Sequence, residues 1–166
     1  NTVRDGWRHI RFLLLAAPDF LFTLHGLAMI ALGLVTSVLA FVAPAGLEIG
    51  SLSWQPVFAG TILLAIGVNS ALVGVVAKLY GASHGFRNED RWVRLYRRWF
   101  HLERVLALAA LLFFSGLMID GLLFVVWASG SEVAMGGRLA ALAQTLLIVG
   151  AELGMAGFLI VTVESP

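Results

Sequence analysis

The chain has 166 residues, of which 60% are apolar and only 13% are charged. Soluble domains average about 45–50% apolar residues, even with glycine counted, and about 25% charged residues. The composition therefore excludes a disordered chain and an ordinary soluble domain, and the lack of cysteine excludes disulfides, thiolate nucleophiles and iron–sulfur clusters. We expect an integral membrane protein. Because the sequence opens with Asn1 and a basic segment, we also expect it to be part of a longer protein.

Four apolar runs are each long enough to cross the hydrocarbon core of a membrane, which takes about 20 helical residues. Backbone groups in lipid must pair within their own segment, so each run predicts a helix. We predict an all-α polytopic membrane protein with basic amphipathic interfacial helices on its cytoplasmic side. The expected parts are a juxtamembrane amphipathic segment (1–18), a four-helix transmembrane domain (19–166) with spans at about 20–42, 57–79, 105–127 and 139–163, and an interfacial loop (80–104).

The basic residues are distributed very unevenly among the segments that connect these spans. Ten of the eleven lie before the first span or between the second and third, and only Arg138 lies on the other side. Lys and Arg mark the cytoplasmic side of a membrane protein. We therefore predict that both termini are cytoplasmic.

Both basic segments have the pattern of helices that lie in the membrane interface. The first places apolar residues at helical spacing beside three arginines, and the loop between the second and third spans repeats this design. In the loop, Trp92, Leu95, Tyr96, Trp99 and Leu102 form the apolar stripe, and the arginines fall mostly opposite. Trp on one face and Arg on the other are typical of a helix in the interface plane.

The arginines of these segments allow two interpretations. They could serve only as a positive-inside anchor, or some could bind the phosphate of a lipid substrate, because the planar guanidinium can bond two phosphate oxygens. Nearby, Glu89 and Asp90 are expected to balance the charges of Arg87 and Arg91. The candidate lipid-phosphate-binding residues are Arg8, Arg11, Arg94, Arg97, Arg98 and Arg104.

Polar side chains also lie at membrane depth, where ionisable groups are costly and usually find a partner or a wet cavity. Asn69, Asp120 and Glu152 could form a proton or ion path, or a network that only stabilises the fold. No sequence motif of a catalytic centre, a metal site or a phosphate-binding loop is present.

Small residues recur at helix-packing spacing in the second and fourth spans. Gly60, Gly67 and Gly74 lie in the second span, and Gly150 and Gly154 lie in the fourth. Such residues let helices approach closely in lipid, either within one chain or between two copies.

Three stretches of the chain are distinctive: Asp5 to Leu14 followed by Pro18, Ala77 to Tyr80, and Phe100 to Arg104. They resemble the membrane region of bacterial family-2 glycosyltransferases of the polyprenyl-phosphate type, which are similar to dolichyl-phosphate mannose synthase. In the third stretch, His101 stands where the family pattern has Thr. The four-span layout matches as well, so the resemblance covers nearly the whole chain.

The resemblance implies an enzyme that transfers a sugar from a nucleotide diphosphate sugar to a polyprenyl phosphate at the cytoplasmic face of the bacterial inner membrane. Its catalytic domain would precede Asn1 and would hold a divalent metal, Mg or Mn. No catalytic residue, metal or cofactor is expected within this segment, which would anchor that domain and present the lipid acceptor. The implied partners are membrane lipid, polyprenyl phosphate, the catalytic domain and a possible second copy, without nucleic acid.

Two alternatives from other classes stay open. One is a stand-alone transporter or flippase-like protein for lipid-linked sugars, with Asn69, Asp120 and Glu152 along its path. The other is a small haem-binding membrane subunit that uses His25 and His101, which lie near the same ends of their spans.

Overall fold

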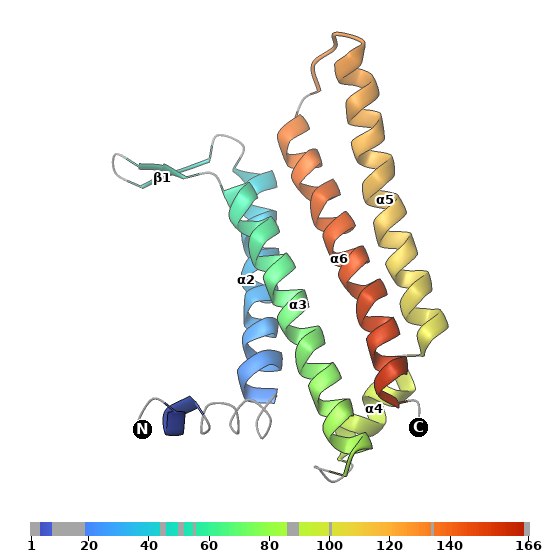
Figure 1. The fold of residues 1–166 in the computed structure, drawn as a ribbon. Helices are drawn as coiled ribbons and strands as arrows, with labels where there is room; N and C mark the ends of the chain where they lie inside the picture. Colours follow the sequence, from blue (N-terminus) through green and yellow to red (C-terminus); the bar gives the residue numbers. More distant parts are fainter. Residues whose placement is uncertain are drawn as a thin grey trace.

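The computed structural model describes residues 4–7, 19–43, 46–49, 52–54, 56–85, 90–99, 101–133 and 135–164. It is built almost entirely from helices (Figure 1). A π-helical segment, η1 (Asp19–Leu24), leads directly into the first long helix, and a short helix, α4 (Arg91–Trp99), lies between the second and third. The four long helices are α2 (His25–Val42), α3 (Pro56–Ser83), α5 (Leu102–Ala128) and α6 (Gly136–Glu164).

All four long helices are long and apolar enough to cross a membrane. With most of η1 included, the first has 23 residues, and the others have 27 to 29. At 1.5 Å per residue they are roughly 35–44 Å long, which exceeds a hydrocarbon core of about 30 Å. The prediction of a helical protein with four membrane-crossing helices is therefore confirmed, and α3 continues to Ser83, beyond the expected end of its span.

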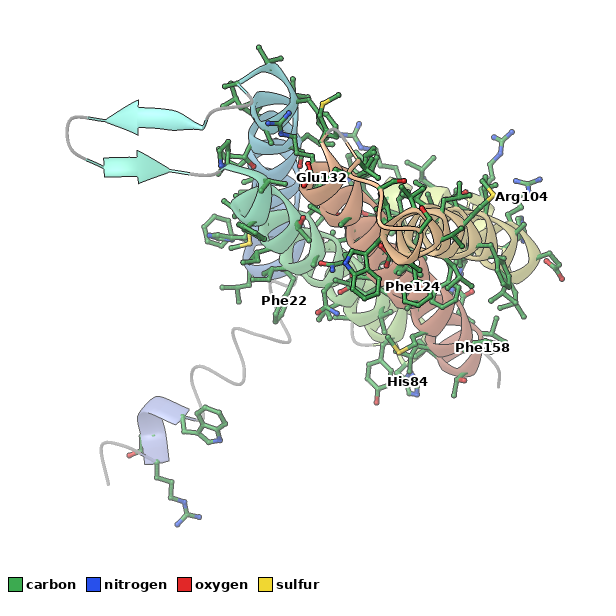
Figure 2. All side chains as sticks on the ribbon, turned by 90° about the horizontal axis from the view of Figure 1, so that it is seen from above. Phe22, His84, Arg104, Phe124, Glu132 and Phe158 are labelled. Carbon is green, nitrogen blue, oxygen red and sulfur yellow. The ribbon has the colours of Figure 1, made fainter. Side chains whose placement is uncertain are left out.

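The long helices stand in an open row rather than in a closed bundle (Figure 1). α3 and α6 pack against each other at the centre, while α2 packs on α3 and α5 packs on α6. Little of each apolar stretch is buried inside the protein, from 11% in α5 to 33% in α3. Apolar side chains such as Val35 and Phe114 are consequently exposed, where lipid would surround them. Phe158 is another, and Figure 2 shows it pointing away from the helices.

Glycines make the close contacts within each outer pair of helices. A Cβ atom on Gly26 would lie 2.7 Å from the carbonyl oxygen of Gly67, and one on Gly150 would lie 2.7 Å from the backbone nitrogen of Phe113. Real Cβ atoms essentially never approach other atoms so closely, so these helices touch at this distance only because a side chain is missing. The small residues therefore serve packing within one chain, with a looser contact at Gly154.

A small antiparallel hairpin, which was not among the predicted elements, connects α2 to α3. Its strands are β1 (Leu47–Ile49) and β2 (Leu52–Trp54), with Leu47 opposite Trp54. The hairpin lies at one end of the row, which we call the hairpin end (Figure 1). It is a local addition to a helical fold.

Helix α4 lies at the opposite end of the row, which we call the α4 end, against the ends of the two central helices (Figure 1). Val93 of α4 is only 1% exposed and packs with Val75 and Leu79 of α3 and with Ile160 of α6. Leu79 and Ile160 are buried just as completely. A compact apolar cluster thus fixes α4 to the membrane domain.

Candidate functional site

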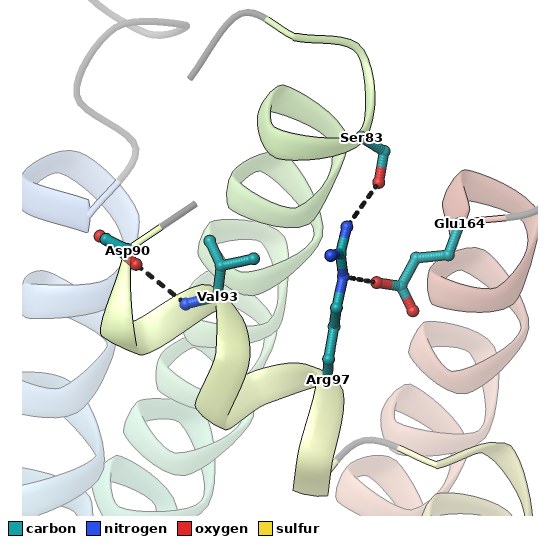
Figure 3. Close-up of polar contacts among 5 residues, drawn as sticks. All are labelled: Ser83, Asp90, Val93, Arg97 and Glu164. Carbon is teal, nitrogen blue, oxygen red and sulfur yellow. Dashed lines mark hydrogen bonds and ion pairs between the residues drawn. The ribbon is translucent and has the colours of Figure 1, made fainter. Parts of the chain in front are cut away.

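Asp90 fixes the first turn of α4. Its Oδ1 accepts hydrogen bonds of 2.9 Å from the backbone N–H groups of Trp92 and Val93, the second of which is drawn in Figure 3. Its Oδ2 lies 3.0 Å from Nζ of Lys78, a side chain that is only 3% exposed. One carboxylate thus caps α4 and neutralises a buried lysine of α3. Asp90 pairs with Lys78 rather than with the adjacent Arg91, because α4 folds back against α3.

The environment of Asp90 favours its charged form. Partial burial raises the pKa of its carboxyl. Three partners lower the pKa and together outweigh this effect: the backbone N–H of Val93, the hydrogen bond and charge of Lys78, and the backbone N–H of Trp92. The net result is a pKa below the ordinary value of 3.8. Asp90 therefore carries its charge throughout the neutral pH range.

Arg97 joins α4 to both central helices. Its Nε donates a 2.8 Å hydrogen bond to Oε1 of Glu164 at the end of α6, and its Nη2 donates a 3.5 Å hydrogen bond to Oγ of Ser83 at the end of α3 (Figure 3). The side chains of Arg97 and Glu164 are 37% and 28% exposed. Among the arginines predicted to bind phosphate, Arg97 is thus committed to a structural contact.

The other described candidates are exposed. Arg94 and Arg98 lie on the outer part of α4, and Arg104 lies in the first turn of α5, where its side chain points away from the protein (Figure 2). The remaining two candidates, Arg8 and Arg11, lie outside the described residues. Among the described candidates, Arg97 thus holds α4 in place, whereas Arg94, Arg98 and Arg104 are exposed at the surface.

Only part of the apolar stripe predicted for α4 faces the protein. Tyr96 packs against the apolar cluster, whereas Trp92 and Leu95 are 46% and 41% exposed. Val93, which the predicted stripe omits, is the most completely buried side chain among residues 91–98 of α4, the part whose burial the structure describes. The guanidinium carbon of Arg91 lies 5.4 Å from the centre of the Trp92 ring, in cation–π range. The outer face of α4 therefore mixes aromatic, aliphatic and basic groups, as a helix at a lipid interface does.

A groove of about 650 Å³ runs between α3 and α6, and we call it the α3–α6 groove. Its lining comes from α3 between Asn69 and Gly81 and from α6 between Glu152 and Val163. Nearly all of these residues are apolar. The groove therefore offers an apolar surface that reaches from the middle of the membrane domain to the α4 end.

Two polar side chains mark the inner end of this groove. Asn69 and Glu152 come from the middle of α3 and α6, and both line the groove. One carboxylate oxygen of Glu152, Oε2, is buried without a hydrogen-bond partner among the described residues. The structure thus brings together two of the three intramembrane polar candidates.

The remaining polar candidates lie apart from this pair. Asp120 is on α5, which packs on α6 and not on α3, and it does not line the groove. His25, whose Nδ1 lies 2.9 Å from the carbonyl oxygen of Phe20, begins α2, and His101 directly precedes α5. These are the two outer helices of the row, and the two central helices separate them. Within the described ranges, no three His, Asp or Glu side chains are grouped so that they could hold a metal ion.

Comparison with known proteins links this arrangement to one family. A model of the glycosyltransferase family 2 C-terminal transmembrane region matches residues 75–164, which include α4 and much of the groove. The low-salt glycan biosynthesis hexosyltransferase Agl6 of Haloferax volcanii is 27% identical over 160 residues, which are 94% of this chain and 38% of that protein. This chain thus spans well under half the length of that relative.

No solved structure matches the chain significantly. The family model, however, covers more than half of the 166 residues and begins within α3, so it includes the helix ends that hold α4. The chain therefore belongs to the glycosyltransferase family 2 C-terminal transmembrane region.

Proposed function

We propose that this chain is the membrane-anchoring and acceptor-presenting region of a glycosyltransferase that moves a sugar from a nucleotide sugar to a polyprenyl phosphate. Family membership supports the glycosyltransferase part, and the relative from Haloferax volcanii is named as a hexosyltransferase of glycan biosynthesis. The transfer itself would take place in a catalytic domain of the parent protein, which would hold the divalent metal. The match spans only 38% of that relative, which leaves room for such a domain.

The observation that carries the acceptor assignment is the separation of the arginines at the α4 end. Arg97 is held by Glu164, whereas Arg98 and Arg104 are exposed beside apolar groups that suit the lipid interface. A guanidinium can bind two oxygens of one phosphate at once, so an exposed Arg can bind a particular phosphate group. General attraction of anionic headgroups needs only positive charge. We assign phosphate binding first to Arg98 and Arg104.

The same distribution of charge supports an orientation. Arg138 is the basic residue of the hairpin end, and the positive-inside rule then favours a cytoplasmic α4 end in the inner membrane. The catalytic domain would lie on that side, so that the sugar donor and the lipid phosphate meet at one interface. The described basic residues of the α4 end are Lys78, Arg91, Arg94, Arg97, Arg98 and Arg104.

Binding of polyprenyl phosphate to the full-length protein in nanodiscs tests this proposal. A hydrogen bond to a charged group contributes about 1.5–3 kcal/mol, so Arg98→Glu and Arg104→Glu should each weaken binding by roughly 10–100-fold. Binding of the uncharged polyprenol should stay unchanged. Arg138→Glu, at the hairpin end, is the matched control and should leave both affinities intact.

The interpretation as a simple anchor makes a different prediction. If the arginines only attract anionic lipid, the reversed charges should reduce membrane insertion and polyprenyl phosphate binding to the same extent. Insertion is therefore measured on the same variants by resistance to alkaline extraction. Equal loss of the two would overturn the acceptor assignment.

A further inference from the structure

We propose that a second copy of this chain packs on the face of the α5–α6 pair that carries Asp120 and Gln144. In this dimer, the side-chain amide of Gln144 in each copy donates a hydrogen bond to the carboxyl group of Asp120 in the other. The pairing involves only the membrane helices, so it is independent of the lipid acceptor and of the arginines at the α4 end.

Asp120 and Gln144 lie inside the hydrocarbon layer and at similar depth. Asp120 is eight residues from Ala128, where α5 ends, and Gln144 is eight residues from Gly136, where α6 begins. Both of these helix ends belong to the hairpin end of the row (Figure 1). Eight helical residues rise about 12 Å, and a helix of this length overhangs a core of about 30 Å by roughly 5–7 Å at each end. Both polar groups therefore lie about 5–7 Å inside the hydrocarbon.

The two side chains also belong to the same side of the contact between α5 and α6. A cavity of about 420 Å³ opens on this side, and its lining includes Leu123 of α5 and Ala140 of α6. Asp120 stands three residues before Leu123, and Gln144 stands four residues after Ala140. Residues three or four apart are neighbours on one helix face. Asp120 and Gln144 are therefore the next residues on this side, one turn deeper in the membrane.

Helix α4 leaves this face uncovered. It packs on Ile160 of α6, which is five residues from Met155, or about 140° around the helix. Gln144 precedes Met155 by eleven residues, which is close to three whole turns, so both lie on the same face of α6, away from α4. Both side chains are exposed, Met155 to 60%. In a single chain, the Gln144 amide would therefore face lipid.

The polar groups of Asp120 and Gln144 lack partners in a single chain. Gln144 is exposed and Asp120 is half-buried, and the structure gives neither side chain a hydrogen bond or ion pair to another described residue. Polar groups are costly in hydrocarbon, and membrane helices satisfy them with hydrogen bonds to other helices. A carboxyl oxygen accepts a hydrogen bond and a carboxamide donates one. The two residues are therefore complementary to each other.

Two-fold symmetry makes a second copy the partner that fits this face. Copies inserted with the same topology are related by an axis along the membrane normal, which leaves every residue at its own depth. Because Asp120 and Gln144 lie at similar depth on neighbouring helices, such an axis can bring Gln144 of one copy opposite Asp120 of the other, and the contact then occurs twice. Two alanines on this face, Ala140 and Ala151, allow a close approach. The face is thus self-complementary.

Association of the full-length protein in liposomes tests the pairing. Donor-labelled and acceptor-labelled protein is diluted with lipid, and the loss of energy transfer gives the dimer affinity. Gln144→Leu and Asp120→Leu should each weaken association by roughly 10–100-fold, because either change removes both reciprocal hydrogen bonds. Ala151→Trp should also weaken it, because the larger side chain separates the two faces. Ala31→Trp, the same change at an exposed position of α2, is the matched control and should leave association intact.

Mixing the two leucine variants tests whether the contact is reciprocal. A dimer of Gln144→Leu with Asp120→Leu regains one of the two hydrogen bonds, which neither variant forms with itself. The mixture should therefore associate about three- to tenfold more tightly than either variant alone. A dependence on Gln144 alone, with no gain on mixing, would mean that the two carboxamides pair with each other and would overturn the reciprocal contact.

Two further outcomes decide whether the interface exists. A wild-type protein that stays monomeric at every lipid dilution, or an unchanged affinity in Gln144→Leu, would overturn it. If Asp120→Leu loses its folded structure, Asp120→Asn replaces it in the test, because asparagine keeps an acceptor oxygen and is close in size. Asp120→Asn should retain most of the association, and a loss as large as that of Gln144→Leu would contradict acceptance by this residue.

Discussion

Arg97 donates its Nε–H to Oε1 of Glu164 at 2.8 Å, and this bond ties α4 to the last residue of α6. The same guanidinium reaches Ser83, the last residue of α3. The contact therefore joins α4 to the ends of both central helices.

Breaking this contact should loosen α4 more than it destabilises the whole domain. Both side chains are partly exposed, so the coupling between Arg97→Ala and Glu164→Ala should be about 0.2–1 kcal/mol in a double-mutant cycle. Amide hydrogen exchange across α4 should rise in each single variant. The swapped pair Arg97→Glu with Glu164→Arg should restore protection, and no recovery would show that the two residues act separately.

Asp90 combines two roles that different substitutions should separate. Asp90→Asn keeps an oxygen that caps α4 but loses the ion pair with Lys78, whereas Asp90→Ala loses both. Loss of a cap costs about 1 kcal/mol, so the alanine variant should be less stable than the asparagine variant by about that amount in thermal or chemical unfolding. Equal stability of the two would mean that the cap contributes nothing.

The lowered pKa of Asp90 predicts a response to acid. Its pKa is lower in the folded protein than in the unfolded chain, so its contribution to stability is complete above the unfolded value and disappears as pH falls through the folded value. We expect α4 to detach below about pH 4, measured as a change in Trp92 fluorescence with the other tryptophans replaced by Phe. In Asp90→Asn this transition should vanish, and its persistence would assign it to another carboxylate.

The glycine contacts predict a sharp contrast between positions. A Cβ on Gly67 would meet the backbone nitrogen of Ile30 at 2.8 Å, and backbone atoms cannot move aside easily. Gly67→Ala should therefore destabilise the α2–α3 pair by about 1–3 kcal/mol in unfolding measured in detergent. Gly121→Ala is the control, because no atom lies within 4 Å of its Cβ, and it should be neutral or slightly stabilising. Similar losses at both positions would show that helix contact is not the cause.

The membrane helices were predictable because hydropathy and span length are local properties of the sequence. The position of α4 was also visible in its arginines and aromatic residues, and the expected membership of the glycosyltransferase 2 family is confirmed. The buried side of α4 was not predictable, since Val93 becomes the core residue only when α4 packs on the ends of α3 and α6.

Long-range pairs explain the rest of the difference between sequence and structure. The partner of Asp90 is Lys78, and the partner of Arg97 is Glu164, and neither pair follows from helical spacing. The groove likewise depends on α3 and α6 being neighbours, which places Asn69 beside Glu152 and leaves Asp120 on another helix. Spacing along the chain identified the polar residues, but the order of helices in the row determines which of them meet.

The open row also determines how freely different parts of this sequence can vary. Helices α2 and α5 each pack on one neighbour, and no other described element covers their outward faces. Fluid lipid tails adapt to any apolar shape. Exposed residues such as Val35 and Phe114 therefore have to stay apolar, but their size and shape are free to change. The glycine contacts, by contrast, are constrained by interatomic distance. Divergence between family members should therefore concentrate on the two flanks of the row, while the contacts between neighbouring helices change slowly.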